Sequence, residues 1–411
     1  MEYQSFSKRQ NLTLTWWNRP RFKDRDGIIC DGSIRSGKTI SMAVGFVLWS
    51  MSRFNGQSFA ICGKTIESLR RNVITLMPQW LEGIFSITER RSENKLIITN
   101  GETTNIYYMF GGKDESSYTL IQGVTLAGVY FDEVALMPRT FVEQAMARCS
   151  VRGSKFWFNC NPENPGHWFY VEWIKKAAER NILYLHFTMD DNLSLAPEIK
   201  ERYEKMYTGV FYRRYILGLW VKAEGLVYPM FNRSVHIVGG IPEYNPRHRY
   251  YVSIDYGTVN PFAAGLYDFS PGEQKATKIR ELYHKGGSNN RIDNEAYYKK
   301  LRELIGGIPI QYLIIDPSAS SMIETIQKYG EYLIVKADND VLNGIQDVTK
   351  YLNAGALYFH ESCKNTFDEF DTYSWDDDSL EDRVIKENDH AMDELRYFCR
   401  TALRNELKWI V

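Results

Sequence analysis

The sequence predicts an α/β protein with two domains, each built around its own sheet. Its 411 residues exceed what a single hydrophobic core usually supports. Short apolar runs alternate with helical patterns in both halves of the chain, which is typical of a parallel sheet covered by helices. A stretch rich in proline and glycine, residues 225–249, interrupts this alternation and predicts a junction. We therefore expect one domain over residues 1–230 and a second over residues 248–411.

The first domain begins with a strand that ends at a glycine. Asn100-Gly101 is a turn signal between two alternating runs and predicts a hairpin. The other runs are separated mainly by helical segments, so they predict a mostly parallel sheet. In chain order, the expected elements are a strand at 27–31, a helix at 39–53, a strand at 58–62, a helix at 66–79, the hairpin, a strand at 128–131, a helix after Pro138 and a strand at 155–158.

The same alternation of apolar runs and helical patterns restarts after residue 249. It predicts a second α/β or α+β domain with a core of its own. The expected elements there are strands at 250–254, 278–283 and 312–315, and helices at 295–304 and 390–403.

The composition excludes several classes of protein. No apolar run approaches the roughly 20 residues that a membrane helix needs, and the N-terminal residues lack the apolar core of a secretory signal. The six cysteines form no CxxC pair, so we expect reduced, mostly buried thiols in a cytosolic protein. The net charge is −1, but the first 240 residues are basic and the rest are acidic. This asymmetry fits one half that approaches phosphates and another that collects carboxylates, although chance also produces it.

A phosphate-binding motif follows the first strand. The segment matches GxxxxGK[ST] and lies between an apolar strand and a helix, which is the context that the motif requires. Its glycines allow backbone N–H groups to surround phosphates, and the helix N-terminus adds positive potential. We expect Lys38 to neutralise the β- and γ-phosphates of ATP and Thr39 to bind Mg²⁺. The predicted nucleotide-binding residues of this motif are Gly32, Ser33, Arg35, Ser36, Gly37, Lys38 and Thr39.

An acidic pair ends the apolar strand at 128–131. Asp132 is expected to hold Mg²⁺ and Glu133 to polarise the attacking water, and a consecutive Asp-Glu favours hydrolysis over phosphate transfer. Asn161 follows the next strand and is either a sensor of the γ-phosphate or part of an Asn-Pro turn. Gln10 precedes the first strand and is either a reader of the adenine edge or an exposed polar residue.

Three aspartates predict a metal site in the second half. Asp255 and Asp316 each end an apolar strand, and Asp393 lies on the last helix with His390 one turn earlier on the same face. Carboxylates suit Mg²⁺ or Mn²⁺, and two such ions can activate water and stabilise the leaving oxygen of a phosphodiester. Each aspartate alone is more simply explained as a strand-end or surface residue, and only the order strand, strand, helix favours a shared metal site. His390 is a weak ligand, a proton shuttle or an exposed histidine, and the acidic segment 375–389 is a solvated loop or a flap over DNA.

Together, these motifs resemble the large subunit of a tailed-phage DNA-packaging terminase, most of all the group found in Gram-positive phages and PBSX-type prophages. Many motors share the ATPase motifs, whereas the full ordered set is specific. The resemblance spans nearly the whole chain and rests on Gln10, Gly32 to Thr39, Leu126 to Glu133, Asn159-Cys160-Asn161-Pro162, Gly218-Leu219-Trp220, Gly225 to Tyr228, Ile254-Asp255-Tyr256-Gly257, Ile315-Asp316-Pro317 and His390 to Tyr397.

The resemblance implies an N-terminal P-loop packaging ATPase joined to a C-terminal RNase H-like nuclease domain. In such a nuclease, Asp255, Asp316 and Asp393 would bind Mg²⁺ or Mn²⁺, with His390 nearby. ATP hydrolysis would drive double-stranded DNA into a procapsid, and the nuclease would cut concatemeric DNA. The implied partners are DNA, a small terminase subunit, the portal protein of the procapsid and further copies in a ring, all in the host cytoplasm.

One position departs from the family pattern. Many large terminases have an arginine just before the glycine upstream of the Asp-Glu pair, where this chain has Gln122-Gly123. Arg35 is then a candidate to act on its own ATP, and Arg139, Arg148 and Arg152 are candidates to act on a neighbour's. The alternative hypotheses are a helicase or repair translocase whose second domain only binds nucleic acid, and a nucleotide-switched scaffold.

Overall fold

Two compact units make up the protein. Unit 1 comprises Met1–Tyr203 and Val210–Lys222, and unit 2 comprises Glu204–Gly209 and Ala223–Val411. The chain belongs to unit 2 briefly at Glu204–Gly209 and then continuously from Ala223, just before the predicted junction at 225–249. The computed structural model describes residues 5–240, 243–256, 261–285, 292–379 and 381–407.

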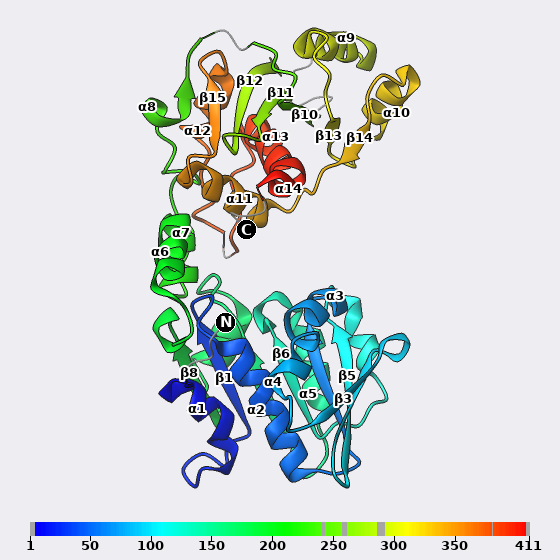
Figure 1. The fold of residues 1–411 in the computed structure, drawn as a ribbon, viewed down its shortest axis with the longest axis vertical. Helices are drawn as coiled ribbons and strands as arrows, with labels where there is room; N and C mark the ends of the chain where they lie inside the picture. Colours follow the sequence, from blue (N-terminus) through cyan, green and yellow to red (C-terminus); the bar gives the residue numbers. More distant parts are fainter. Residues whose placement is uncertain (1–4, 241–242, 257–260, 286–291, 380, 408–411) are drawn as a thin grey trace. The chain divides into compact units, whose positions relative to one another are not determined.

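Unit 1 contains an eight-stranded sheet in the order β3-β4-β5-β2-β6-β7-β1-β8 (Figure 1). All neighbours from β5 to β8 are parallel, and only β3 and β4 add an antiparallel edge. The expected mostly parallel sheet is confirmed, including the hairpin at Asn100-Gly101. The strands are β1 (Gly27–Gly32), β2 (Ser58–Gly63), β3 (Ser86–Arg90), β4 (Lys95–Asn100), β5 (Thr103–Gly111), β6 (Gly128–Asp132), β7 (Lys155–Asn159) and β8 (Ile182–Phe187).

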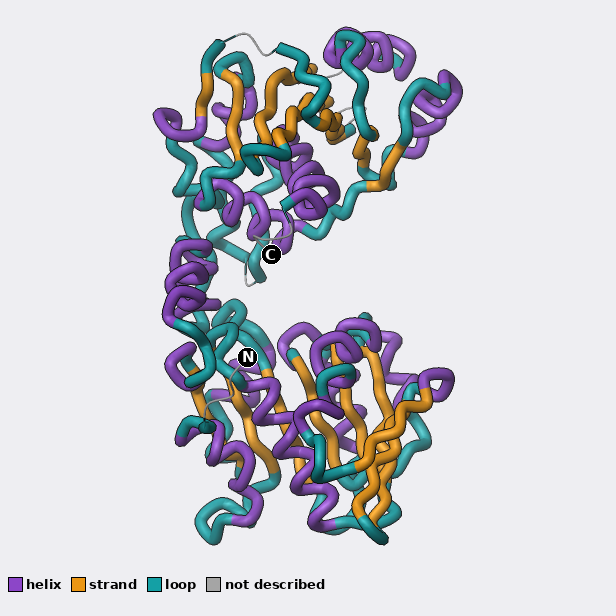
Figure 2. Tube along the Cα trace, viewed as in Figure 1, coloured by secondary structure: helices purple, strands orange, loops and turns teal. Residues whose placement is uncertain are grey.

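Helices cover both faces of this sheet (Figure 2). Successive side chains of a strand point to opposite faces of the sheet, so the buried strand β1 contributes to two cores. Ile28 packs with α2, and Ile29 packs with α5. Phe46 of α2 lies edge-on to Trp157 of β7, with ring centroids 5.9 Å apart, so large aromatic side chains fix the helix on the sheet. The helices are α1 (Lys8–Thr15), α2 (Lys38–Arg53), α3 (Ile66–Leu69), α4 (Met77–Trp80) and α5 (Arg139–Ala147). Two further helices, α6 (Pro197–Met206) and α7 (Gly209–Phe211), are divided between unit 1 and unit 2.

The predicted helix at 66–79 is wrong as a continuous element. The segment contains α3, a π-helical turn at Arg70–Ile74 and α4. Pro78 lies in the first turn of α4, where its missing N–H is tolerated but where it ends any helix that precedes it.

Unit 2 contains a seven-stranded mixed sheet in the order β14-β13-β10-β11-β12-β15-β9. Strands β10, β11 and β12 form an antiparallel meander, and β13 and β14 continue parallel to β10. This is the strand arrangement of the RNase H-like fold. The strands are β9 (Ile237–Val238), β10 (Arg249–Asp255), β11 (Phe262–Ser270), β12 (Lys275–His284), β13 (Tyr312–Ile315), β14 (Ile334–Lys336) and β15 (Leu357–His360).

The helix that carries Asp393 and the helix α9 lie on opposite faces of this sheet. Val252 and Ile254 pack with Leu301 of α9, whereas the intervening Ser253 donates a hydrogen bond of 2.8 Å to the Glu394 carbonyl of α13. Helix α13 passes into a π-helical turn at Cys399–Leu403, so the predicted helix at 390–403 is present with a change of winding. The helices are α8 (Arg233–His236), α9 (Asn294–Ile305), α10 (Ser320–Tyr329), α11 (Val341–Asn353), α12 (Lys364–Phe370), α13 (His390–Phe398) and α14 (Arg404–Glu406).

Candidate active sites

The P-loop turns between β1 and α2 at positions that only glycine fits. Gly32 has φ 128°, and a Cβ there would lie 1.9 Å from the carbonyl oxygen of Phe187. Gly37 has φ 81°, and a Cβ there would lie 2.2 Å from Nε2 of Gln10. The two glycines let the backbone enter helix α2 with its N–H groups free for phosphates.

Lys38 is buried at the start of α2 and points back over the loop. Its Nζ donates hydrogen bonds to Gly32 O (3.1 Å), Ser33 O (2.7 Å), Ser36 Oγ (3.3 Å) and Asn161 Oδ1 (3.1 Å). All four acceptors are neutral, and burial lowers the pKa of Lys38. A buried ammonium surrounded by neutral oxygens fits an anionic phosphate ligand.

Asn159 joins the two residues predicted to hold the magnesium ion of ATP. Its Nδ2 donates to Thr39 Oγ1 (3.1 Å) and to Asp132 Oδ1 (2.8 Å). Tyr130 donates a second hydrogen bond of 2.9 Å to the same carboxylate oxygen. Burial raises the pKa of Asp132, and the bonds from Asn159 and Tyr130 oppose that rise. The sequence motif contained Asn159, but its bridging position follows only from the pairing of β6 with β7.

Glu133 and Lys38 are connected through Asn161. The Asn161 amide donates to both carboxylate oxygens of Glu133, at 2.9 and 3.0 Å, while its own oxygen accepts from Lys38. Glu133 has φ 60°, which turns its side chain out of the strand direction. Burial and the neighbouring Asp132 raise the pKa of Glu133 to about 7, against the attraction of Lys38. The geometry therefore brings Asn161 into contact with both groups, as a γ-phosphate sensor would require.

These side chains line a cavity of about 510 Å³. Arg71 and Asn72, from the π-helical turn after α3, also line it and were not predicted. Gln10 lies against Gly37 but does not belong to the lining among the residues that the structure describes. The lining residues are Ile34, Arg35, Ser36, Gly37, Lys38, Thr39, Ile40, Arg71, Asn72, Leu76, Trp80, Asp132, Glu133, Asn161 and Asn192.

Two of the four candidate arginines have side-chain partners of their own. Arg35 lines the cavity, and its Nε donates to the Tyr203 hydroxyl at 2.8 Å. Arg139 pairs with Glu143 on the exposed face of α5, at 2.7 Å. A second subunit is needed to place any of the trans candidates against an ATP, so these assignments stay predictions.

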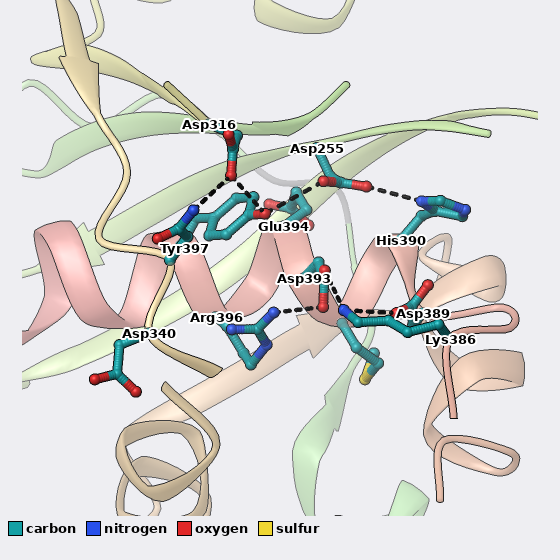
Figure 3. A network of polar contacts seen from close by, with 12 residues as sticks. Asp255, Asp316, Asp340, Lys386, Asp389, His390, Asp393, Glu394, Arg396 and Tyr397 are labelled. Carbon is teal, nitrogen blue, oxygen red and sulfur yellow. Dashed lines mark hydrogen bonds and ion pairs between the residues drawn. The ribbon is translucent and has the colours of Figure 1, made fainter. Parts of the chain in front are cut away.

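In unit 2, the predicted acids meet at one end of the sheet (Figure 3). Asp255 ends β10 and Asp316 follows the parallel neighbour β13, so both carboxylates leave the same edge. Helix α13 supplies His390 and Asp393 from its first turn. Gly257, part of the motif that begins at Ile254, lies outside the described residues.

Protein donors hold each of the three acids. Nδ1 of His390 lies 2.8 Å from Asp255 Oδ2, and burial raises the pKa of Asp255 despite this contact. Tyr397 was not predicted; its hydroxyl donates to Asp316 Oδ2 at 3.2 Å and approaches Asp255 Oδ1 at 3.5 Å. Asp393 accepts from the nearly buried Arg396 at 2.5 Å. The phenol thus links two strand-end carboxylates, and the guanidinium fixes the third (Figure 3).

A second cavity, of about 330 Å³, opens beside these acids. Asp255, His390 and Asp393 line it, whereas Asp316 is reached through Tyr397 and does not line it. Within the described part of the chain, no three His, Cys, Asp or Glu side chains are grouped closely enough to bind one metal ion as they stand. The full lining is Asp255, Tyr256, Pro261, Lys386, Glu387, Asn388, Asp389, His390 and Asp393.

A P-loop unit followed by an RNase H-like unit with strand-end carboxylates defines a chain that combines an ATPase with a nuclease. The family profile described as "Terminase large subunit, T4likevirus-type, N-terminal" matches residues 29–235. The chain belongs to the large terminase subunit family. It is therefore a subunit of a viral DNA-packaging motor, and the narrower expectation of a PBSX-type member stays a prediction.

Solved structures of one relative resemble the whole chain. The large terminase of a thermophilic bacteriophage is 49% identical over 97% of this chain and 100% of its own, with a TM-score of 0.92. Its complexes with ADP and with ATP-γ-S are 48% identical over the same shares, with TM-scores of 0.89 and 0.88. Comparison with curated proteins finds no match. None of the described helices has the length and apolar character to cross a membrane.

Proposed function

We propose that unit 1 hydrolyses ATP with Lys38, Thr39, Asp132 and Glu133 in the roles that the motifs predict. The contacts of Asn161 with Lys38 and Glu133 carry this proposal, because they connect the phosphate-binding cation to the water-polarising carboxylate. Lys38 would bind the phosphates, and Thr39 and Asp132 would hold the magnesium ion. Glu133, with its raised pKa, would accept the proton of the attacking water.

Unit 2 is proposed to cut DNA with Asp255, Asp316 and Asp393 as ligands of Mg²⁺ or Mn²⁺. The donor chemistry supports this, since carboxylate oxygens at strand ends suit these ions and His390 adds a nitrogen at the rim. Divalent ions at such a site supply charge neutralisation and a more acidic water. The residues contribute orientation: Tyr397 holds two of the carboxylates, and Arg396 holds the third.

The partners follow from the family and stay part of this proposal. Double-stranded DNA, a small terminase subunit and the portal of a procapsid would bind the chain in the host cytoplasm. Several copies would form a ring, in which Arg139, Arg148 or Arg152 of one subunit would contact the ATP of the next. DNA binding should involve mainly phosphates and therefore weaken steeply with salt.

Plasmid cleavage by the purified full-length chain, in Mg²⁺ or Mn²⁺, tests whether the nuclease and the ATPase use separate sites. We expect Asp255→Asn to abolish cleavage and to leave ATP hydrolysis intact, and Lys38→Ala to do the reverse. Asp368→Asn, at an exposed acid of α12, is the matched control and should change neither activity. Cleavage that survives Asp255→Asn, or that never depends on metal, would overturn the nuclease site and favour a translocase that only binds DNA.

A further inference from the structure

The nuclease cavity contains a lysine of the protein itself. Nζ of Lys386 lies 3.3 Å from Asp393 Oδ2 and 3.2 Å from Asp389 Oδ2 (Figure 3). Both carboxylates are largely buried, with side-chain exposures of 13% and 7%. The ammonium thus bridges two acids in the cavity where the proposed metal ligands Asp255 and Asp393 lie.

Asp389 is a fourth carboxylate of this cavity, and neither motif nor spacing singled it out. Its Oδ2 is buried and makes no hydrogen bond among the described residues, so the ion pair with Lys386 is the contact that compensates its charge. Two buried carboxylates that lie about one helical turn apart repel each other unless a cation lies between them. A cation is therefore part of the stable arrangement of Asp389 and Asp393.

The two cations that contact Asp393 differ in how firmly they are held. Arg396 projects from α13 itself, and its side chain is only 2% exposed. Lys386 lies in the loop before α13, and its side chain is 61% exposed. A guanidinium fixed in the core stays in place, whereas a lysine on a loop can swing into solvent without disturbing the helix.

We propose that the Lys386 ammonium is a tethered cation that occupies a metal-binding position between Asp389 and Asp393. A divalent ion binds there only when it displaces Lys386, and Asp389 then becomes an additional carboxylate of the metal site. The tether competes with the metal at every concentration, so it raises the metal concentration at which the nuclease site fills. This inference rests on the proposed nuclease function and adds to it a device that keeps the free protein from cutting DNA.

Binding of Mn²⁺ to the full-length chain, measured by titration calorimetry without DNA, tests the proposal. We expect Lys386→Met to bind Mn²⁺ about tenfold more tightly than the wild type. The reason is that a partly exposed ammonium no longer competes with the metal for the two carboxylates. Lys386→Arg retains the cation and should stay close to the wild type. Lys300→Met removes a lysine from α9, on the opposite face of the sheet, and controls for the change in net charge.

The outcomes separate this inference from the proposed function. The gain in Lys386→Met should persist at about 0.5 M salt, where charges more than a few ångströms apart are screened. An unchanged Mn²⁺ affinity in Lys386→Met, or an equal gain in Lys300→Met, would overturn the proposed role of Lys386 without contradicting the proposed nuclease site. If the wild type and Lys386→Met both fail to bind Mn²⁺, or if Asp255→Asn does not weaken binding, the proposed metal site itself is wrong.

Discussion

At the scale of single residues, spacing identifies a side chain most directly where its neighbours lie close along the chain. Lys38 and Thr39 belong to a local loop, so spacing alone located them. Asn159 and Tyr397 gain their roles from partners on other elements, namely the neighbouring strand β6 and the strand ends of β10 and β13. Lys386 is a similar case, because a lysine in an acidic segment is ordinary until its tertiary contacts are seen.

Glu133 should be the residue on which turnover depends most. Glu133→Gln preserves the shape and the hydrogen bond from Asn161 but removes the proton acceptor. We expect ATP hydrolysis to fall by about two to four orders of magnitude, which is the usual contribution of a general base. Binding of a fluorescent ATP analogue should stay within a few-fold of the wild type. A variant that hydrolyses ATP at near the normal rate would show that another group activates the water.

The raised pKa of Glu133 also predicts a pH-dependent stability of unit 1. In the unfolded chain this carboxyl has its ordinary pKa of 4.5, and in the folded chain about 7. Below pH 4.5 the carboxyl is protonated in both states and does not destabilise the fold. As pH rises from 4.5 to 7, the unfolded chain loses the proton more readily, so the free energy of unfolding falls. In the absence of metal and nucleotide, Glu133→Gln should be more stable than the wild type at pH 8 by about 3 kcal/mol. The two proteins should converge near pH 4.5, as measured by urea unfolding.

An exposed glutamate gives the comparison for that experiment. Glu143→Gln, on the outer face of α5, removes a carboxylate that pairs with Arg139 at the surface. Its free energy of unfolding in urea should stay within a few tenths of a kcal/mol of the wild-type value at each pH. Parallel curves for Glu133→Gln and the wild type would contradict the assigned pKa.

At the scale of elements, a buried ion pair connects helix α13 to the sheet of unit 2. Nζ of Lys278 on β12 lies 2.7 Å from Glu394 Oε2, and both side chains are at most 1% exposed. Gly265 of β11 makes room for this pair, because a Cβ there would lie 2.6 Å from the Glu394 carboxylate and 2.7 Å from Lys278 Cε. The pair adjoins Asp393, so it determines how the nuclease helix sits on the strands.

Breaking this pair on one side should destabilise unit 2 strongly. Lys278→Met leaves the Glu394 carboxylate buried without its cation, which costs about 3–5 kcal/mol. The double variant Lys278→Met/Glu394→Gln should recover most of that loss, because no charge is then left in the core. Differential scanning calorimetry that follows the transition of unit 2 measures both effects, and Lys275→Met at the exposed pair with Glu273 is the control. Equal stabilities of the single variant and the wild type would show that Glu394 is uncharged when folded.

Periodicity predicted elements well where one face is buried and poorly where winding changes. The fully buried strands β1 and β6 follow directly from their apolar runs. The helix expected at 66–79 is interrupted because Pro78 and the π-helical turn do not alter the spacing of apolar residues. Strand β11 was missed because its small residues, Ala263 to Gly265, give a weak apolar signal although they are buried beneath α9 and α13.

At the scale of the whole molecule, the two units have separate cores and should unfold in separate steps. ADP with Mg²⁺ should raise the unfolding temperature of unit 1 only. At a hundredfold excess of ADP over its Kd, the free energy of unfolding of unit 1 should rise by about 2.7 kcal/mol. Differential scanning calorimetry measures this, and Lys38→Ala should abolish the shift while the other transition stays in place. A single transition that moves as one with nucleotide would show that the units unfold cooperatively.

The architecture of the chain was the most predictable property. Two α/β units, their order and the type of site in each follow from motifs that lie at strand ends, because strand ends are where parallel sheets place their functional groups. The acids of unit 2 were expected to converge on a metal. That convergence on a metal stays a prediction. The structure shows that each acid is also engaged by a donor of the protein, an arrangement that depends on side-chain contacts and cannot be predicted from spacing.

The bridge that Asn159 forms between Thr39 and Asp132 has a thermodynamic consequence. Both proposed magnesium ligands are oriented by the protein itself, since one amide donates to both. The entropy of ordering them has already been lost during folding, so binding of the ion does not lose it again. A motor that must rebind ATP in every cycle gains from this, because each new nucleotide finds its ligands already oriented.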